Sequence, residues 1–338
     1  MRTLGSLRLG RNTARLLRWC LGLGTLTWLV LFLDTGGITS SLSKASWPLA
    51  LPAVLGLVAV QFLGAAMWKL LSDRLSGTRF SWAFAMRAYY AAQAVGSLTP
   101  SNVGADVYRI YAVSGDGNSW MEPAVPIIAQ RLLSYLALVG LAGAAAFVVP
   151  LPAGMYIALA ALTGALVAGT GALWFLARKI SDEGSLVRWA MRRFGVSDRL
   201  MEVDRSRLAA ALGGGLILAL AFHVIAVLIT YVLVLSLGLQ DHRLQVLAAL
   251  LLARLTIIIP FSINGLGFQE GALALLFPAI GIPAEQALAV SLLGRLALVL
   301  TISLGALSLL WGRAAQYDDE RLSAAHSRRR KPYPLLPR

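Results

Sequence analysis

Pro260-Phe261-Ser262-Ile263-Asn264-Gly265-Leu266-Gly267-Phe268-Gln269-Glu270 lies between two long apolar runs, at a place where an apolar helix would be expected to continue. The stretch instead holds a proline, two glycines and a carboxylate. In hydrocarbon, irregular backbone persists only inside protein or beside a water-filled cavity, because each unpaired backbone group costs several kcal/mol. A charge such as that of Glu270 adds to this cost and marks a functional candidate. The stretch therefore predicts a helix broken at Pro260, Gly265 and Gly267 beside a membrane-embedded site.

A second stretch, Pro100-Ser101-Asn102-Val103-Gly104-Ala105-Asp106-Val107-Tyr108-Arg109, has similar features. Here the predicted break is at Pro100 and Gly104. In both stretches a charged residue follows a glycine by five positions, Arg109 after Gly104 and Glu270 after Gly265. Each stretch also precedes an arginine inside an apolar run, Arg131 in the first case and Arg295 in the second. We therefore expect two related halves that close on one site.

The composition is that of an integral membrane protein. The chain has 338 residues, of which 58% are hydrophobic and only 14% charged, and its mean hydropathy is +0.71; a soluble domain has about 25% charged residues. The net charge of +14 would suggest nucleic-acid binding in a soluble protein. Most basic residues, however, lie in the tails and one loop, which is typical of the positive-inside rule and of attraction to anionic lipid headgroups.

The apolar runs predict an all-α polytopic membrane protein with six full spans and two broken hairpins. The expected spans are 19–33, 47–71, 124–149, 153–177, 208–238 and 284–312. The organisation that follows is a basic cytoplasmic segment (1–18), a first membrane repeat (19–149), a second membrane repeat (153–312) containing an interfacial cytoplasmic loop (178–207), and a basic cytoplasmic tail (313–338).

Charge distribution constrains the topology. The positive-inside rule places the N-terminus, 73–81, 178–207 and 313–338 in the cytoplasm of a cell (inner) membrane protein. Since 124–149 supplies one crossing, 80–118 should enter and leave on the cytoplasmic side, and 244–281 should enter and leave from outside. This is an inverted-topology repeat, in which interrupted helices form a site near the midplane. Full crossing by either hairpin stays open, because 80–99 is almost long enough to cross at about 1.5 Å per residue.

Two blocks of the sequence are similar to those of a known family. The first is Ser97-Leu98-Thr99 with the Pro100–Arg109 stretch and Gln130-Arg131-Leu132-Leu133; the second is the Pro260–Glu270 stretch with Leu293-Gly294-Arg295-Leu296. The chain resembles, over roughly residues 15–312, the flippase-like membrane domain of lysylphosphatidylglycerol synthases, which also occurs as free-standing proteins. The resemblance implies movement of lipids or lipid-linked headgroups between leaflets. Since no aminoacyl-transferase domain follows the last span, we expect no lysyl-lipid synthesis.

The candidate substrate-binding residues are charged or amide side chains within the apolar runs. A guanidinium group suits a lipid phosphate because its planar fork donates two parallel hydrogen bonds and stays charged. A carboxylate would accept hydrogen bonds from a headgroup or act as a protonatable coupling site. These candidates are Arg109, Arg131, Arg254, Arg295, Asp106, Glu270, Asn102 and Asn264.

Each candidate also has a structural alternative. The charges could form ion pairs that hold the halves together, for instance Glu270 with Arg295 or Asp106 with Arg131. The two asparagines lie at the breaks, where a side-chain amide can cap freed backbone groups. Tyrosines around the first hairpin could line a headgroup path or form an interfacial belt (Tyr89, Tyr90, Tyr108 and Tyr111).

The function favoured by these observations is a lipid translocase of the flippase or scramblase type with a central polar cleft, more transporter than enzyme. Two alternatives stay open: a membrane transferase acting on a lipid phosphate, and a non-catalytic scaffold for a lipid or glycan synthase. The expected partners are membrane phospholipids or lipid-linked intermediates, with a second copy or a separate synthase possible and no nucleic acid. We expect no cofactor or metal, because no nucleotide-binding motif occurs and the three histidines and single cysteine are not clustered.

Overall fold

The computed structural model describes residues 40, 42–76, 78–97, 99, 102–114, 120–148, 205–258 and 267–310, with a few single positions between 160 and 168. These ranges are helical, and no strand occurs within them. Several predicted segments lie outside the described residues, wholly or almost wholly: 1–18, 19–33, 153–177, 178–207 and 313–338. The breaks at Pro100, Pro260 and Gly265, and the candidate Asn264, also lie outside them.

Four stretches are long and apolar enough to cross a membrane, by length and composition. Helices α3 (Trp47–Ala59) and α4 (Gln61–Leu71) and the π-helical turn η1 (Ser72–Ser76) form the first of them. The other three are α7 (Met121–Ala145), α11 (Arg205–Ser236) and α14 (Ala284–Leu310). Even α7, with 25 residues, is about 38 Å long, more than the roughly 30 Å of bilayer hydrocarbon. Four of the six predicted spans are thereby confirmed as helices of spanning length.

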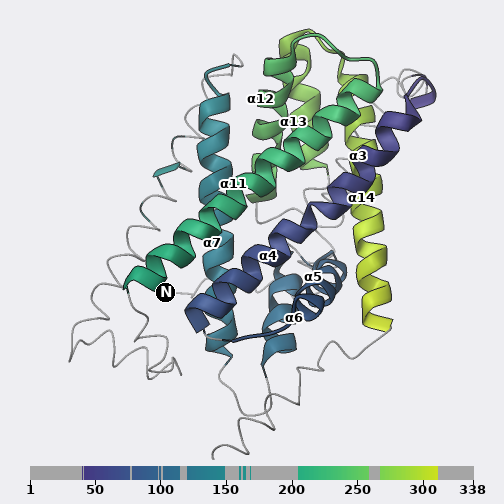
Figure 1. Cartoon of the computed structure of the whole chain (residues 1–338). Coiled ribbons are helices and arrows are strands. Elements are labelled where there is room, and N and C mark those ends of the chain that lie inside the picture. Colours follow the sequence, from purple (N-terminus) through teal and green to yellow (C-terminus); the bar gives the residue numbers. More distant parts are fainter. Residues whose placement is uncertain are drawn as a thin grey trace, which may run out of the picture.

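Two hairpins of shorter helices lie between these spans. One pairs α5 (Trp82–Gly96) with α6 (Val103–Val113); the other pairs α12 (Arg243–Arg254), extended by η3 (Leu255–Ile258), with α13 (Phe268–Leu276), which is followed by η4 (Pro278–Ile280). The longest of the four hairpin helices, α5, has 15 residues and is therefore about 22 Å long, too short to cross. Figure 1 shows α5 and α6 at the lower end of the long helices and α12 and α13 at the upper end.

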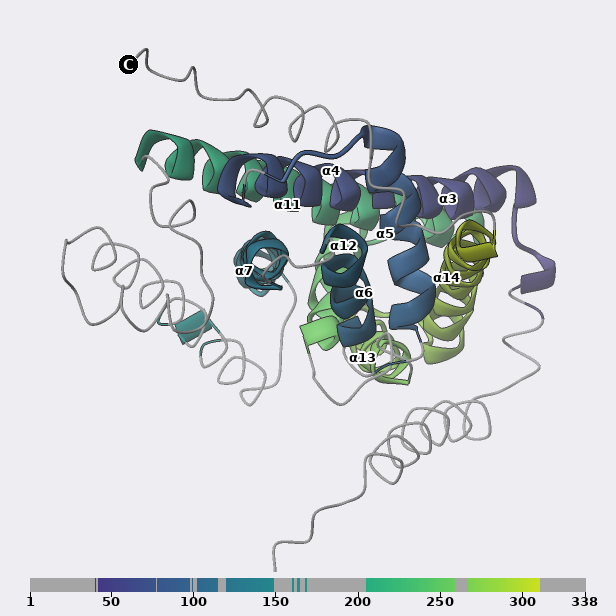
Figure 2. The same ribbon diagram turned by 90° about the horizontal axis from the view of Figure 1, so that it is seen from below.

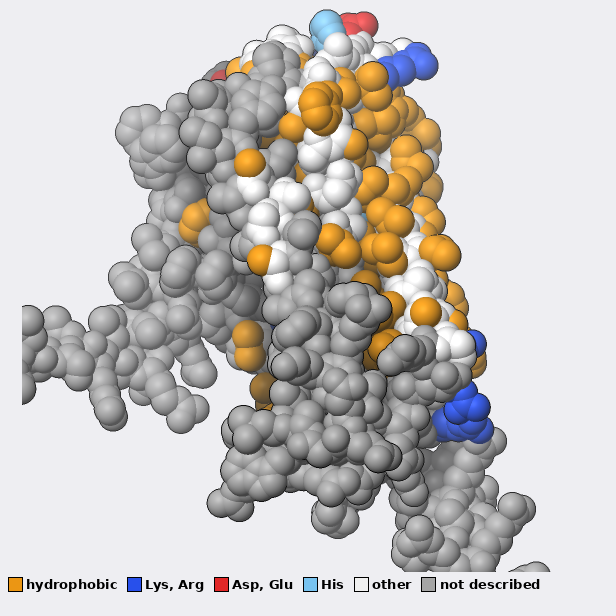
Figure 3. Space-filling view, turned by 90° about the vertical axis from the view of Figure 1, so that its left-hand side faces the viewer, with side chains coloured by type: hydrophobic (Ala, Val, Ile, Leu, Met, Phe, Trp, Pro, Cys, Tyr) orange, Lys and Arg blue, Asp and Glu red, His pale blue; other side chains and the backbone are white. Residues whose placement is uncertain are grey.

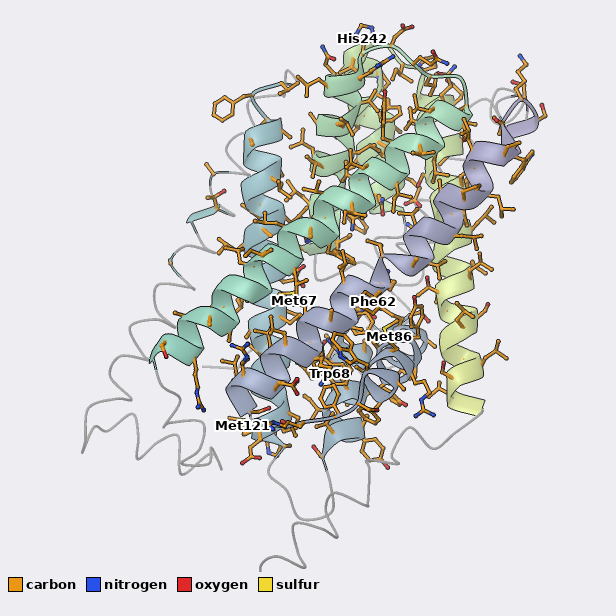
Figure 4. The ribbon with its side chains drawn as sticks, in the orientation of Figure 1. Phe62, Met67, Trp68, Met86, Met121 and His242 are labelled. Carbon is orange, nitrogen blue, oxygen red and sulfur yellow. The ribbon has the colours of Figure 1, made fainter. Side chains whose placement is uncertain are left out.

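The helix bounds of the two halves correspond under one constant shift. A shift of 164 residues carries Asp106 onto Glu270 and Arg131 onto Arg295 (106 to 270, 131 to 295). The same shift carries the range of α7 onto 285–309, and α14 covers Ala284–Leu310. The two helices run in opposite directions: Met121, where α7 begins, lies at the lower end in Figure 4, whereas α14 ends there in Figure 1. An inverted repeat would produce this correspondence, and the repeat itself stays a prediction.

The helices form a bundle around the hairpins. Seen from below, α11 lies beside α3 and α4 along one edge, with α7 and α14 on either side of the hairpins (Figure 2). On one outer face, hydrophobic side chains cover the middle of the described part, and charged side chains lie near its upper and lower ends (Figure 3). This distribution suits a bilayer, whose hydrocarbon excludes charge from the middle of the protein surface.

Close approach between α14 and α5 requires a residue without a side chain. A Cβ atom on Gly305 would lie 2.1 Å from the backbone oxygen of Tyr90 and 3.0 Å from Cβ of Ala94. Tyr90 in turn donates a hydrogen bond from its hydroxyl group to the Val58 carbonyl (2.7 Å), which connects α5 to α3. Small residues at such crossings allow the backbones to pack closely, and van der Waals packing is a main source of helix association in membranes.

We therefore expect Gly305→Ala to lower the melting temperature of the purified protein in detergent by several degrees, because α14 would have to move away from α5. The matched control is Gly294→Ala on the same helix, where the added Cβ has no neighbour within 4 Å. Equal melting temperatures for the two variants would contradict the packing described here.

Candidate functional site

The first cluster of charges is centred on Asp106, in the first turn of α6. Its Oδ1 atom accepts a hydrogen bond from Arg109, one turn later, at 2.6 Å. Its Oδ2 atom forms an ion pair with Nε of Arg131 on α7. One carboxylate therefore joins two arginines, and it ties the hairpin helix α6 to the long helix α7.

Arg109 is held on several sides by neighbouring helices and is only 6% exposed. Its guanidinium carbon lies 5.5 Å from the ring centroid of Trp68 and 5.3 Å from that of Tyr89. It also donates a hydrogen bond to Oε1 of Gln130 (2.6 Å), whose Nε2 atom donates to the Gly64 carbonyl (2.8 Å). This set of contacts fixes the position of Arg109 inside the protein.

Three of these neighbours, Gln130, Trp68 and Gly64, were missed by the sequence reasoning as parts of the site. Gly64 has a clear steric role, because a Cβ atom there would lie 2.2 Å from the Tyr89 hydroxyl oxygen. Gln130 directly precedes Arg131, is one of the few uncharged polar residues in α7 and belongs to the first family-like block; these sequence features could have pointed to it. Trp68 carried no such feature, since its neighbours come from elsewhere in the chain.

Thr99, which lies between α5 and α6, stabilises the start of α6. Its Oγ1 atom accepts a hydrogen bond from the backbone nitrogen of Gly104 (2.7 Å) and donates to the Gly96 carbonyl (2.9 Å). Gly104, predicted at a break, lies in the first turn of α6, and a Cβ atom there would lie 2.7 Å from Thr99 Oγ1. The missing side chain of Gly104 therefore leaves room for Thr99.

Asn102 precedes α6 in the left-handed region (φ +57°), and its side chain makes no capping hydrogen bond. The expectation that its amide caps freed backbone groups is therefore wrong, because Thr99 supplies the cap. Instead, Nδ2 of Asn102 donates to Oε1 of Gln93 (3.0 Å), and the Asn102 carbonyl accepts a hydrogen bond from Arg131 (3.1 Å). Arg131 also donates to the hydroxyl group of Tyr135 (3.0 Å).

The second cluster is centred on Glu270, in the first turn of α13. Its side chain is 0% exposed, and Oε1 accepts hydrogen bonds from Nε of Arg295 (2.6 Å) and Oγ of Ser291 (3.2 Å), both on α14. Gly267, the residue directly before α13, has φ +77°, a conformation that glycine adopts without steric cost. Both carboxylates thus occupy a first helical turn, where the helix dipole favours negative charge.

The two clusters are equivalent in sequence spacing, although not in the register that the glycines suggested. Each arginine follows its carboxylate partner by 25 residues (106 to 131, and 270 to 295). The glycine-plus-five spacing had matched Arg109 with Glu270, whereas the structure matches Asp106 with Glu270. Under the 164-residue shift Arg109 corresponds to Leu273, which is buried in the apolar core. The first carboxylate cluster therefore holds one arginine more than the second.

The ion-pair alternative correctly named both pairs, Asp106 with Arg131 and Glu270 with Arg295. Each pair, however, joins two helices of the same half and does not connect one half to the other.

Arg254, the remaining candidate, lies in the last turn of α12, and no ion pair to it is found among the described residues. In the same ranges, no group of three His, Cys, Asp or Glu side chains could hold a metal ion.

Breaking the second pair should be strongly destabilising. In Arg295→Met the Glu270 carboxylate would stay buried without this cation, which typically costs about 3–5 kcal/mol. The double variant Glu270→Gln/Arg295→Met removes both charges, so we expect it to be more stable than Arg295→Met alone. The free energy of unfolding, measured by denaturant titration in mixed micelles, gives the comparison; strictly additive losses would contradict a direct interaction between the two residues.

Comparison with known proteins agrees with the resemblance noted in the sequence. The model of one family, described as the lysylphosphatidylglycerol synthase TM region, matches residues 19–306, which include both charge clusters and both hairpins. A search of curated proteins found no match to the chain. Because the family model matches most of the sequence, the chain belongs to the family of the lysylphosphatidylglycerol synthase transmembrane region.

Proposed function

We propose that this protein is a lipid translocase that moves a phospholipid or a lipid-linked headgroup between the two leaflets. The observation that supports the proposal most directly is the pair of carboxylate–arginine clusters at equivalent positions of two hairpins. Ionisable residues inside membrane segments cost at least about 2.5–3.5 kcal/mol each on insertion scales, so they are retained chiefly for function. A family match to a membrane domain of lipid synthases is consistent with a lipid substrate.

The first cluster is the more exposed of the two. The side chains of Arg131 and Asp106 are 26% and 17% exposed, and that of Arg109 is 7% exposed. In the second cluster Arg295 is 17% exposed, but its partner Glu270 is fully buried. We therefore assign direct headgroup contact to Arg131 and Asp106. The burial of Arg109 and Glu270 favours a role in holding the hairpins in place.

The headgroup could bind to Arg131 if its phosphate took the place of Asp106. Asp106 bonds to two arginines through its two oxygens, and a lipid phosphate offers acceptor oxygens of the same charge. The phosphate would replace Asp106 at Arg131, while Asp106 would keep its bond to Arg109. Guanidinium N–H groups bind a phosphate oxygen as they bind a carboxylate oxygen, so the Nε atom of Arg131, which contacts Asp106, could bind the phosphate instead.

The proposed hairpins face opposite sides of the membrane, as in transporters built from inverted repeats. Rocking of one half against the other would open the site to each leaflet in turn. We place the lower end of the molecule in Figure 1 in the cytoplasm of the cell (inner) membrane, with both termini on that side. Exposed basic residues support this orientation: Arg74, Arg79 and Arg87 belong to segments at the lower end.

Transport is tested with purified protein in liposomes that carry a fluorescent phospholipid, by quenching the outer-leaflet label with dithionite. We expect the native protein to exchange label between leaflets faster than protein-free vesicles. Arg131→Lys keeps the charge but loses the planar fork, so we expect it to slow exchange about tenfold or more. The matched control, Arg87→Lys, changes an exposed arginine on α5 and should leave the rate unchanged.

Other outcomes would contradict the proposal. A change in lipid mass would indicate the transferase alternative. Unchanged leaflet distribution and unchanged lipid mass, together with a synthase that co-purifies with the protein, would indicate the scaffold alternative. Exchange that is equally fast in Arg131→Lys and the native protein would exclude the assigned role of Arg131.

A further inference from the structure

Of the four candidate arginines, Arg254 differs in forming no ion pair with a carboxylate among the residues that the structure describes. Arg109, Arg131 and Arg295 each pair with Asp106 or Glu270. Arg254 is mostly buried in the last turn of α12, and its Nε atom is buried without a hydrogen-bond partner. Its guanidinium carbon lies 5.9 Å from the ring centroid of Phe222 on α11.

A second unsatisfied polar atom lies beside that ring. His223, next to Phe222 in the chain and only 4% exposed, has a buried Nδ1 atom without a hydrogen-bond partner. Its other ring nitrogen is held by Ser134 on α7, at 3.0 Å from the hydroxyl oxygen and 3.1 Å from the carbonyl oxygen. Polar atoms without a hydrogen-bond partner, on two different helices, therefore lie beside one aromatic ring.

No carboxylate among the described residues forms an ion pair with Arg254. Asp241 precedes the opposite end of α12, about 20 Å away along the helix. The Oε1 atom of Glu270 bonds to Arg295 and Ser291. The negative end of the α12 dipole offsets part of the charge, but it offers no acceptor to the buried Nε atom. A charged donor left in this condition is costly, and an anion from outside the chain would remove the cost.

We infer that Arg254 is a second residue that binds the phosphate of the transported lipid, in addition to Arg131, with His223 beside it. The inference rests on the proposed function and deepens it by naming a further phosphate-binding residue. In this arrangement the phosphate oxygens accept hydrogen bonds from the guanidinium group of Arg254, while the acyl chains stay in the bilayer. Arg109 and Arg295 hold the hairpins through their carboxylate partners, whereas Arg254 forms no ion pair among the described residues.

The test is lipid-dependent stabilisation of the purified protein, which needs no transport. We expect phosphatidylglycerol to raise the melting temperature of the native protein, and diacylglycerol, which has the same tails without a phosphate, to have little effect. Arg254→Met should need about tenfold or more phosphatidylglycerol for the same shift, because it loses a charged hydrogen bond. Without lipid, Arg254→Met should be at least as stable as the native protein, because it removes an unpaired buried charge.

Arg243→Met is the matched control, since it removes the same charge from the exposed first residue of the same helix. It should respond to phosphatidylglycerol as the native protein does, and Arg254→Lys should respond at an intermediate concentration. An equal response of Arg254→Met and the native protein would overturn the inference. So would an equal shift produced by inorganic phosphate at the same concentration, which would indicate a free-phosphate site.

The binding result and the transport result separate the two proposals. Transport by the native protein together with lipid binding that ignores Arg254 would overturn only the present inference. Binding of phosphatidylglycerol that depends on Arg254, without any transport by the native protein, would overturn the translocase proposal and support Arg254 as a lipid-phosphate site.

Discussion

A carboxylate bonded to an arginine from the next long helix is the interaction on which both halves of this protein depend. Short helices cannot cross a bilayer, so a hairpin within it must be held by side-chain contacts and by close packing. Asp106 and Glu270 each occupy the first turn of a hairpin helix, and Arg131 and Arg295 approach them from α7 and α14. In each half the hairpin is thereby fixed to a helix of spanning length.

The two halves use this interaction differently. In the second half Glu270 is fully buried, although its partner Arg295 is 17% exposed. In the first half both Asp106 and Arg131 are partly exposed, and Asp106 also binds a second arginine. The additional Arg109 is enclosed by Trp68, Tyr89 and Gln130, so the extra charge is stabilised within the protein. We interpret this asymmetry as a division between a half that is closed by its ion pair and a half whose ion pair can exchange partners.

Much of this arrangement was predictable from sequence, because apolar run length and charge placement are local properties. They predicted the four described spans, the two short hairpins and the ion-pair partners offered as structural alternatives. The register between the halves was not predictable from Gly104 and Gly265, since the pairing is set by contacts 25 residues apart. The residue that caps the start of α6 was not predictable either. Asn102 adopts φ +57°, and the Thr99 hydroxyl group accepts the hydrogen bond from the Gly104 backbone nitrogen instead. Gln130 and Trp68 acquire their roles only from helices distant in the chain.

The most direct test is whether both ends of each hairpin face the same side of the membrane. Single cysteines at Arg79, Ser114, Asp241 and Glu285, introduced into a Cys20→Ala background, can be labelled in intact cells with an impermeant maleimide. The account predicts labelling of Asp241→Cys and Glu285→Cys from outside, and labelling of Arg79→Cys and Ser114→Cys only after the membrane is opened. Labelling of Arg79→Cys and Ser114→Cys from opposite sides would show that α5 and α6 do not form a returning hairpin, and would contradict the account.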